Sequence, residues 1–211
     1  MFPPVEAANA DGLLAVGGKL SVSTLREAYH NGIFPWPVED FPLLWFAPPR
    51  RAILPFDQFH ISRRLQRTLR HANFEMRINT NFEAVIRACA EQRQDAEGTW
   101  ITDEMLEAYI ALHQAGDAHS VETYQNGELV GGLYGVAFGS YFAGESMFYK
   151  VSDASKAALV HLVEYLQTKG ATWLDAQMMT LLFANFGACE IPRRRFMKML
   201  KIALEQPTKL F

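Results

Sequence analysis

The chain has 211 residues, of which 49% are hydrophobic and 20% charged, and its formal net charge is −3 at pH 7. Such a length and composition predict an ordinary soluble globular protein, with one large domain alone or with a small appendage. The slightly acidic balance excludes nucleic-acid binding driven by overall charge, so any such role would require a local basic patch.

The first helix is predicted close to the N-terminus. Ser23 or Thr24 provides its cap, and Glu27 completes a capping box. The helix runs through Tyr29 and ends at Gly32, because glycine readily adopts the left-handed conformation found after helix ends.

Two segments rich in proline and aromatic residues follow, 32–37 and 43–51. The first is too rigid for an ordinary linker, and the second is expected to mark a domain boundary. Trp45 is expected in the core of a small lobe. Trp36 lies between two prolines and is harder to bury, which favours an exposed stacking surface.

A basic helix is predicted over residues 62–70, with Leu65 and Leu69 on one face. Its other faces carry Arg63, Arg64, Arg67 and Arg70. Any one arginine on a helix is most often a plain solvated side chain. Four together, without an acidic partner in a chain that is net acidic, favour a surface that binds phosphate groups.

Strands and helices follow one another along the rest of the chain. The predicted strands cover 74–79, 120–124 and 172–177, with two more in the glycine-rich run 128–148, which an Asn126-Gly127 hairpin turn precedes. The glycines of that run indicate a backbone that another segment approaches closely. The predicted helices cover 82–91, 102–116, 152–170, part of 178–186 and 193–204.

Two features leave alternatives open. Trp100, directly before the Thr102 helix cap, is either a hydrophobic staple or a second exposed stacking ring. The arginine run 193–195 opposes the dipole of the last helix, which indicates either an external anion or neighbouring acids such as Glu190.

Three polar side chains lie in strands that should otherwise be apolar. Glu145 stands alone in the glycine-rich run, while Asp175 and Gln177 lie two residues apart in the strand 172–177. Residues two apart in a strand face the same side of a sheet. Because buried polar groups are costly unless they are paired or used, we expect these three to converge on a site in the middle of a sheet.

The sequence lacks the usual metal, phosphate and nucleophile motifs. Its six histidines are scattered, there is no paired CxxC, P-loop or GxSxG elbow, and Ser146 in Gly-Glu-Ser-Met-Phe lacks the final glycine of that elbow. We therefore expect neither a metal nor a cofactor. Acyl transfer from an activated ester requires only alignment, an unprotonated amine and donors for the developing oxyanion.

No stretch is long enough to span a membrane, and the N-terminus lacks a basic region followed by an apolar run. Cys89 and Cys189 lie far apart without metal-ligand spacing, which favours reduced thiols. We expect a cytoplasmic protein that does not bind membranes, and nothing in the sequence demands more than a monomer.

Several long motifs share one order with a known enzyme family. They are Gly32-Ile33-Phe34-Pro35-Trp36, Gly98-Thr99-Trp100-Ile101-Thr102, His119-Ser120-Val121-Glu122, Leu129-Val130-Gly131-Gly132-Leu133-Tyr134-Gly135-Val136, Gly144-Glu145-Ser146-Met147-Phe148 and Gly187-Ala188-Cys189-Glu190-Ile191-Pro192-Arg193-Arg194. They cover nearly the whole chain, which resembles the leucyl/phenylalanyl-tRNA protein transferases. The resemblance implies an α+β fold: a small N-terminal α/β domain, 1–50, and a larger acetyltransferase-like (GNAT-like) domain, 51–211, whose mostly antiparallel sheet is flanked by helices.

The resemblance also implies an activity. Members of the family move leucine, phenylalanine or methionine from aminoacyl-tRNA to the amino group of proteins that begin with arginine or lysine, which directs those proteins to N-degron degradation. The implied site residues are Asp175 and Gln177 as the catalytic pair with Glu145 beside them, and Trp36 and Trp100, with Tyr29 nearby, as the rings that hold the 3′-terminal adenosine.

Residue chemistry refines these roles. A neutral amide is barely basic, so we expect Gln177 to orient the attacking amine while Asp175 polarises it by a hydrogen bond; a base role for Gln177 stays open. Glu145 could hold an ammonium or fix Gln177. The basic helix would meet the tRNA acceptor stem without reading its sequence. The pocket for the aminoacyl side chain is expected to be lined by Leu133, Phe142, Met147, Phe148 and Leu174.

One stretch departs from the family pattern. The family usually continues after the catalytic pair with a polar Asn and a His, whereas Thr180, Leu181 and Leu182 stand here. The role that those polar groups serve for the peptide substrate is therefore in question in this chain.

Two other functions share parts of the pattern. An acetyl-coenzyme A-dependent N-acetyltransferase would need a glycine-rich loop for the pyrophosphate, which residues 151–155 do not supply. A non-catalytic tRNA-binding module would share the basic helix but would not need the catalytic pair.

Overall fold

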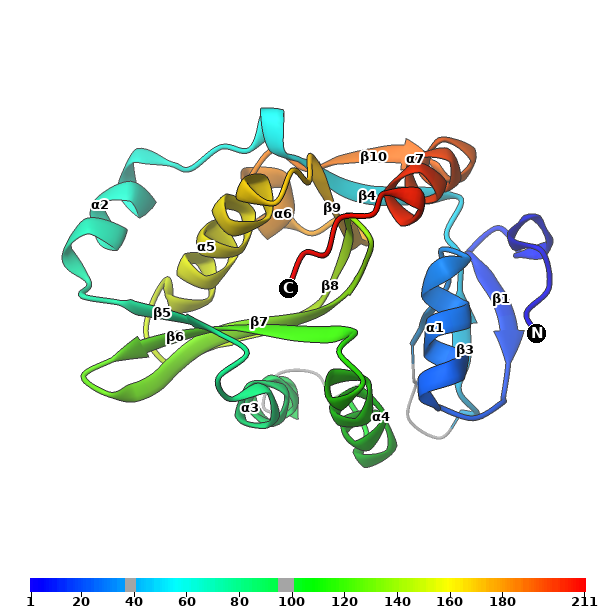
Figure 1. Ribbon diagram of the computed structural model, residues 1–211, viewed down its shortest axis with the longest axis horizontal. Coiled ribbons are helices and arrows are strands. Elements are labelled where there is room, and N and C mark those ends of the chain that lie inside the picture. Colours follow the sequence, from blue (N-terminus) through cyan, green and yellow to red (C-terminus); the bar gives the residue numbers. More distant parts are fainter. Residues whose placement is uncertain (37–40, 95–100) are drawn as a thin grey trace.

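The computed structural model describes residues 1–36, 41–94 and 101–211. A three-stranded sheet, in the order β1-β3-β2, lies at one end of the molecule, and a seven-stranded sheet, in the order β10-β4-β9-β8-β7-β6-β5, forms its body (Figure 1). Neighbouring strands of the larger sheet are antiparallel except β8 and β9, which run parallel. A mostly antiparallel sheet flanked by helices confirms the expected α+β fold class.

The small sheet belongs to an N-terminal lobe. Its elements are η1 (Val5–Ala7), β1 (Leu13–Val16), α1 (Val22–His30), β2 (Phe34–Pro35) and β3 (Leu44–Phe46). Ser21, not Ser23 or Thr24, caps α1, since its side chain accepts a hydrogen bond from the Thr24 backbone N–H. Trp45 is 1% exposed and fills the core of this lobe, as predicted.

The large sheet contains two strands that escape the sequence prediction. Its strands are β4 (Arg50–Pro55), β5 (Glu75–Ile78), β6 (Ala118–Gln125), β7 (Glu128–Phe138), β8 (Tyr141–Tyr149), β9 (Trp173–Gln177) and β10 (Cys189–Pro192). β4 begins inside the proline-rich segment expected to be a boundary, and β10 is short. The division into domains 1–50 and 51–211 remains a proposal.

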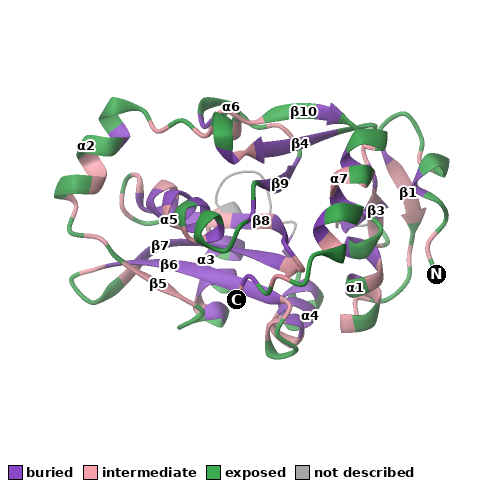
Figure 2. Ribbon diagram, turned by 45° about the horizontal axis from the view of Figure 1, so that its top comes forward, coloured by how far each residue is buried: buried purple, intermediate pink, exposed green. Residues whose placement is uncertain are grey.

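Helices cover both faces of the sheet around β6, β7 and β8 (Figure 1). α3 (Phe82–Gln94) and α4 (Asp103–Gln114) lie on one face and α5 (Ala154–Thr168) lies on the other. The remaining helices are η2 (Phe56–Gln58), α2 (Arg63–His71), α6 (Leu181–Asn185) and α7 (Arg193–Glu205). Figure 2 shows that the central strands and α5 are mostly buried, whereas α2 is mostly exposed.

The glycines of β7 permit the close approach that the sequence predicts. A Cβ on Gly131 would lie 2.6 Å from the Ala154 side chain at the start of α5. A Cβ on Gly135 would lie 2.2 Å from the Ala143 carbonyl oxygen and 2.5 Å from the Phe142 ring. Both distances are too short for any side chain, so these glycines let α5 and β8 pack directly on the β7 backbone.

Candidate active site

A β-bulge places Glu145 in β8. Along β7 the pairing passes from Ser146 directly to Gly144, so Glu145 is the extra residue. A bulge shifts the alternation of a strand by one residue and re-aims the side chain that it carries. It therefore lets Phe142 and Met147, five residues apart, face the same side of the sheet.

A second bulge ends β9. Along β4 the pairing passes from Asp175 directly to Gln177, so Ala176 is the extra residue. Gln177 has a φ of 61°, in the left-handed region that residues other than glycine seldom adopt. Asp175 and Gln177 therefore do not share one face, contrary to the expectation for a regular strand.

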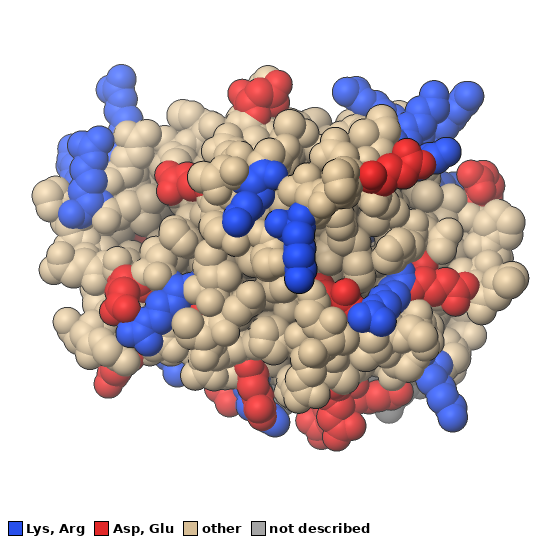
Figure 3. Space-filling view, viewed as in Figure 1, with Lys and Arg blue, Asp and Glu red and all other residues tan. Residues whose placement is uncertain are grey.

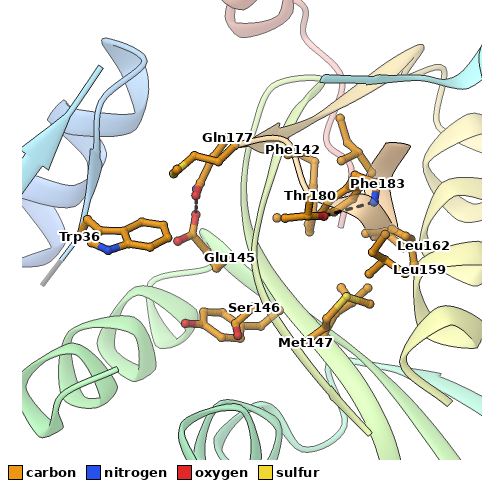
Figure 4. Close-up of a pocket in the computed structure, with 17 residues that line it drawn as sticks. Trp36, Phe142, Glu145, Ser146, Met147, Leu159, Leu162, Gln177, Thr180 and Phe183 are labelled. Atoms are coloured by element: carbon orange, nitrogen blue, oxygen red, sulfur yellow. Dashed lines mark hydrogen bonds between the residues drawn. The ribbon is translucent and has the colours of Figure 1, made fainter. Parts of the chain in front are cut away.

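An apolar cavity of about 300 Å³ lies beside these bulges, between β8, β9, α5 and α6. β8 and β9 pair at Ala143 and Asp175. The cavity is lined by the predicted residues Leu133, Phe142, Met147 and Leu174, and by Leu159, Leu162, Leu182 and Phe183. Glu145 and Gln177 lie at one end of it, and the side chains from α5 and α6 lie at the other (Figure 4).

Phe148 corrects the predicted pocket, because it does not line this cavity. It follows Met147 directly in β8, and consecutive side chains of a strand point to opposite faces. Phe148 is 1% exposed in the core on the other face of the sheet, together with Val85 and Cys89 of α3.

Asp175 is fully buried, and protein donors occupy both of its carboxylate oxygens. Arg51 of β4 donates from Nε to Oδ1 at 2.8 Å and from Nη2 to Oδ2 at 2.6 Å. The Tyr141 hydroxyl donates to Oδ2 at 2.6 Å, and the Gln177 backbone N–H donates to Oδ1 at 2.8 Å. Asp175 does not line the cavity, so its link to the cavity is the Gln177 backbone.

Arg51 is buried as deeply as its partner, with 1% of its side chain exposed. Its guanidinium lies 4.6 Å from the ring centroids of both Phe34 and Phe196, and Nη1 donates to the Gly32 carbonyl at 3.2 Å. Burial alone lowers the pKa of Arg51, but the Asp175 carboxylate raises it above its ordinary value. The charged pair thus joins β4 and β9 to the N-terminal lobe.

Glu145 is bound by hydroxyl and amide donors. The Tyr109 hydroxyl donates to Oε2 at 3.2 Å, and the Tyr109 and Tyr29 hydroxyls are hydrogen-bonded to each other. Gln177 Nε2 donates to Oε1 at 2.6 Å (Figure 4). Burial raises the pKa of Glu145 to about 8, although hydrogen bonds from the two tyrosines oppose that shift. Burial therefore favours the neutral form of Glu145 in the folded protein.

The contact with Glu145 also orients the Gln177 amide. Because Nε2 donates to the carboxyl group, the other end of the amide, Oε1, is left for a substrate donor. An amide held in this way can accept a hydrogen bond from an amine and align its lone pair, which is the requirement for acyl transfer.

Comparison with known proteins decides the family. Residues 53–201 match the leucyl/phenylalanyl-tRNA protein transferases, and residues 18–49 match the N-terminal domain of the same proteins. This chain belongs to that family. It is therefore an aminoacyltransferase, and neither an acetyl-coenzyme A-dependent enzyme nor a non-catalytic tRNA-binding module.

Individual relatives agree with this assignment. The leucyl/phenylalanyl-tRNA protein transferase of Nitrosospira multiformis is 53% identical over 203 residues, which cover 95% of this chain and 88% of that protein. The one from Aromatoleum aromaticum is 54% identical over 197 residues, covering 92% and 83%. The crystal structure of FemX has a TM-score of 0.52 at 11% identity, covering 83% of this chain and 70% of that one, which shows the fold alone.

The predicted adenosine-binding rings of this transferase differ in their placement. Trp36 lines the cavity beside Glu145 and Gln177 (Figure 4). Tyr29 is 0% exposed and belongs to the hydrogen-bond network around Glu145, so it cannot stack on a base, which corrects its predicted role. Trp100 lies outside the described residues, and its role remains a prediction.

The predicted basic surface is exposed. Arg63, Arg64, Arg67 and Arg70 of α2 all face solvent, and no ion pair joins them to an acid within the described ranges. Figure 3 shows Lys and Arg side chains gathered over this end of the transferase, and a second group near β10 and α7.

The arginine run 193–195 at the start of α7 belongs to that second group. Glu190 pairs with Arg50 at 3.0 Å, and Arg193 donates to the Ala47 carbonyl at 2.6 Å. The nearest predicted acid therefore does not neutralise the run, which favours the alternative of an external anion.

Neither a cluster of metal ligands nor a membrane-spanning helix lies within residues 1–36, 41–94 and 101–211 of the transferase. There, no three side chains among His, Cys, Asp and Glu are grouped as a metal site would need. No helix there has both the length and the apolar character that crossing a bilayer requires.

The residues that hold the two acids escape the sequence analysis. A buried carboxylate needs a counter-charge or several donors, so an arginine beside an apolar run, such as Arg51 before 52–54, is the signal that could have been used. Tyr109 and Tyr141 carry no comparable signal, because tyrosines are common in cores.

Proposed function

We propose that this transferase moves leucine, phenylalanine or methionine from aminoacyl-tRNA to the α-amino group of proteins that begin with arginine or lysine. The observation that carries the proposal is the apolar cavity of about 300 Å³ with the Gln177 amide and the Glu145 carboxyl at one end. The aminoacyl side chain would fill the cavity. The 3′-terminal adenosine would stack on Trp36, with Trp100 as a second ring.

The reaction needs no group beyond substrates and side chains. The acceptor amine attacks the ester carbonyl carbon, a C–N bond forms, the bond from that carbon to the ribose oxygen breaks, and the amine proton passes to that oxygen. Gln177 Oε1 would accept a hydrogen bond from the amine and fix its direction of attack, which is the role that a weakly basic amide serves best.

Asp175 would act as a positioning residue. Gln177 adopts a left-handed backbone conformation, and the hydrogen bond of 2.8 Å from its N–H to Asp175 Oδ1 supports that conformation. Without this bond the strained backbone could relax, and the amide would move away from the amine. The Arg51 pair would in turn keep Asp175 in place.

Glu145 supports the choice of a basic acceptor. Its pKa of about 8 reflects burial, so the ionised form is disfavoured unless a positive charge comes close. The side chain of an N-terminal arginine or lysine, or the α-ammonium group before it loses its proton, would provide that charge. A neutral acceptor would not offset the desolvation of the carboxylate.

The cavity would select the aminoacyl group by shape. Apolar selection is worth only about 1–3 kcal/mol per methylene, so leucine, phenylalanine and methionine would all be accepted. The arginines of α2 would bind tRNA phosphates without reading sequence. A single chain provides every residue of the site, and charged tRNA places the reaction in the cytoplasm.

The proposal is tested by mixing the transferase with leucyl-tRNA and peptides that begin with Arg, Lys, Asp or Ala, and measuring the added residue by mass. We expect addition to the Arg and Lys peptides only. Gln177→Ala should reduce turnover at least about 100-fold with tRNA affinity retained, because alignment of the amine is lost.

The matched control is Gln167→Ala, which removes an exposed amide of α5. Its turnover should equal that of the unmodified transferase. Addition to no peptide at all, or unchanged turnover in Gln177→Ala, would overturn the proposal.

A further inference from the structure

The segment after Gln177 exposes apolar side chains that a fold would normally bury. None of the five described residues of α6 is buried, although four of them are apolar. Leu181 is 80% exposed, and Met178, which precedes the helix, is 49% exposed. Exposed apolar groups scattered singly are common, but here two lie three residues apart in the segment that directly follows Gln177.

This segment is continuous with the cavity. Met178, Thr180, Leu182 and Phe183 line it, and Met178 directly follows Gln177. Leu181 is not part of the lining and faces solvent. The segment 178–183 thus presents one side to the cavity and another to the outside, next to the amide that would align the acceptor amine.

We propose that the segment 178–183 is a docking surface for the residues that follow the N-terminal residue of the protein acceptor, and that it prefers apolar side chains there. The proposal rests on the function proposed above, and it specifies which acceptor sequences the transferase prefers.

The reach of an extended chain supports this assignment. Leu181 is four residues beyond Gln177, so their Cα atoms lie within about 15 Å of each other. An extended acceptor advances about 3.3 Å per residue. With its amine at Gln177, its second to fifth residues would therefore be long enough to reach 178–183.

Peptide is a better occupant of this surface than nucleic acid. Residues 178–185 contain no charged side chain, and binding to phosphates depends on lysine and arginine. The Thr180 hydroxyl already accepts a hydrogen bond from the Phe183 N–H at 3.2 Å, as the cap of α6. The remaining side chains of 178–183 offer methyl, thioether and aromatic groups, which suit apolar acceptor residues.

The test compares two acceptors, Arg-Leu-Ile-Gly-Gly and Arg-Ser-Thr-Gly-Gly, in steady-state transfer of leucine from leucyl-tRNA. We expect KM to be about fivefold to tenfold lower for the apolar peptide, because its side chains leave water on docking. Leu181→Asn should reduce that difference to less than about twofold. The matched control, Ile202→Asn, changes an aliphatic side chain of α7 that is 60% exposed, and it should keep the full difference.

Four results would overturn the docking surface. The first two are an equal KM for the two peptides and an unchanged KM difference in Leu181→Asn. The third is a raised KM for leucyl-tRNA in Leu181→Asn, which would make the segment a tRNA contact. The fourth is a change of oligomeric state in Leu181→Asn, which would make the segment an interface between two copies. Transfer to neither peptide would instead overturn the proposed function itself.

Discussion

Two carboxylates on neighbouring strands of this transferase lie in opposite environments. Asp175 on β9 is fully buried in the core and forms an ion pair with Arg51, which is equally buried. Glu145 on β8 lines the cavity, and it accepts hydrogen bonds from the neutral donors Tyr109 and Gln177. The same chemical group is therefore held in a buried ion pair in one place and among neutral donors in the other.

The difference in environment indicates that the two acids have different roles in the site. A carboxylate whose oxygens are all engaged cannot exchange partners during a reaction, so Asp175 is suited to support structure. A carboxyl group with a raised pKa changes its charge when a cation arrives, so Glu145 is suited to respond to a substrate. Gln177 connects the two, since its backbone binds Asp175 and its side chain binds Glu145.

The largest effect is expected from Arg51→Met, which leaves the Asp175 charge buried without its partner. We expect the free energy of unfolding to fall by about 3–5 kcal/mol, measured by urea denaturation. Arg50→Met is the matched control, because Arg50 forms its ion pair with Glu190 at the surface. That pair should contribute no more than about 1 kcal/mol. Equal losses in the two variants would contradict the sealed environment of Asp175.

A smaller effect distinguishes the two tyrosines that donate to these acids. Tyr141→Phe removes a donor from Asp175, which is paired with Arg51, and should cost about 1.5–3 kcal/mol of unfolding free energy. Tyr109→Phe removes a donor from the mostly neutral Glu145, and the Tyr29 hydroxyl, which also loses Tyr109, keeps its own hydrogen bond with Glu145, so the cost should be about 0.5–1.5 kcal/mol. Thermal and urea unfolding of both variants measure the difference. A larger loss for Tyr109→Phe would reverse the comparison.

The sequence is sufficient to predict the strands and the helix around these acids, but it is not sufficient to predict the contacts that the acids make. Glycines and alternation predict the strands that become β7 and β8, and an apolar stripe predicts α5. The inference that Glu145, Asp175 and Gln177 gather in the sheet also follows from polar residues in apolar strands. What these patterns lack is the position of each bulge, because an extra residue leaves no mark on a short hydrophobic pattern.

The bulges explain the particular errors. A regular β9 would turn Asp175 and Gln177 to one side, and only the three-dimensional pairing with β4 shows that Ala176 intervenes. Arg51 lies 124 positions from its partner in the chain, so no local pattern links the two. The error on Phe148 has a different cause. Phe148 follows Met147 directly, and the alternation of side chains along a strand already argues against placing both in one pocket.

The last expected effect is a pH dependence that belongs to Glu145 alone. Its pKa is about 8 in the folded protein and near 4.5 without the fold, so the folded state holds more protons between these values. Stability from the neutral acid is therefore fully present below about pH 4.5 and is lost as the pH rises through 8. Urea midpoints at pH 5, 7 and 9 should fall more steeply in the unmodified transferase than in Glu145→Gln.

The comparison of the two proteins isolates this group, because other titrating residues contribute equally to both curves. An added peptide that begins with arginine should flatten the curve of the unmodified transferase, since its positive charge favours the ionised carboxylate. It should leave Glu145→Gln with no such change in slope. Parallel curves without peptide would mean that Glu145 is already ionised in the fold, and the two carboxylates would then differ only in their partners.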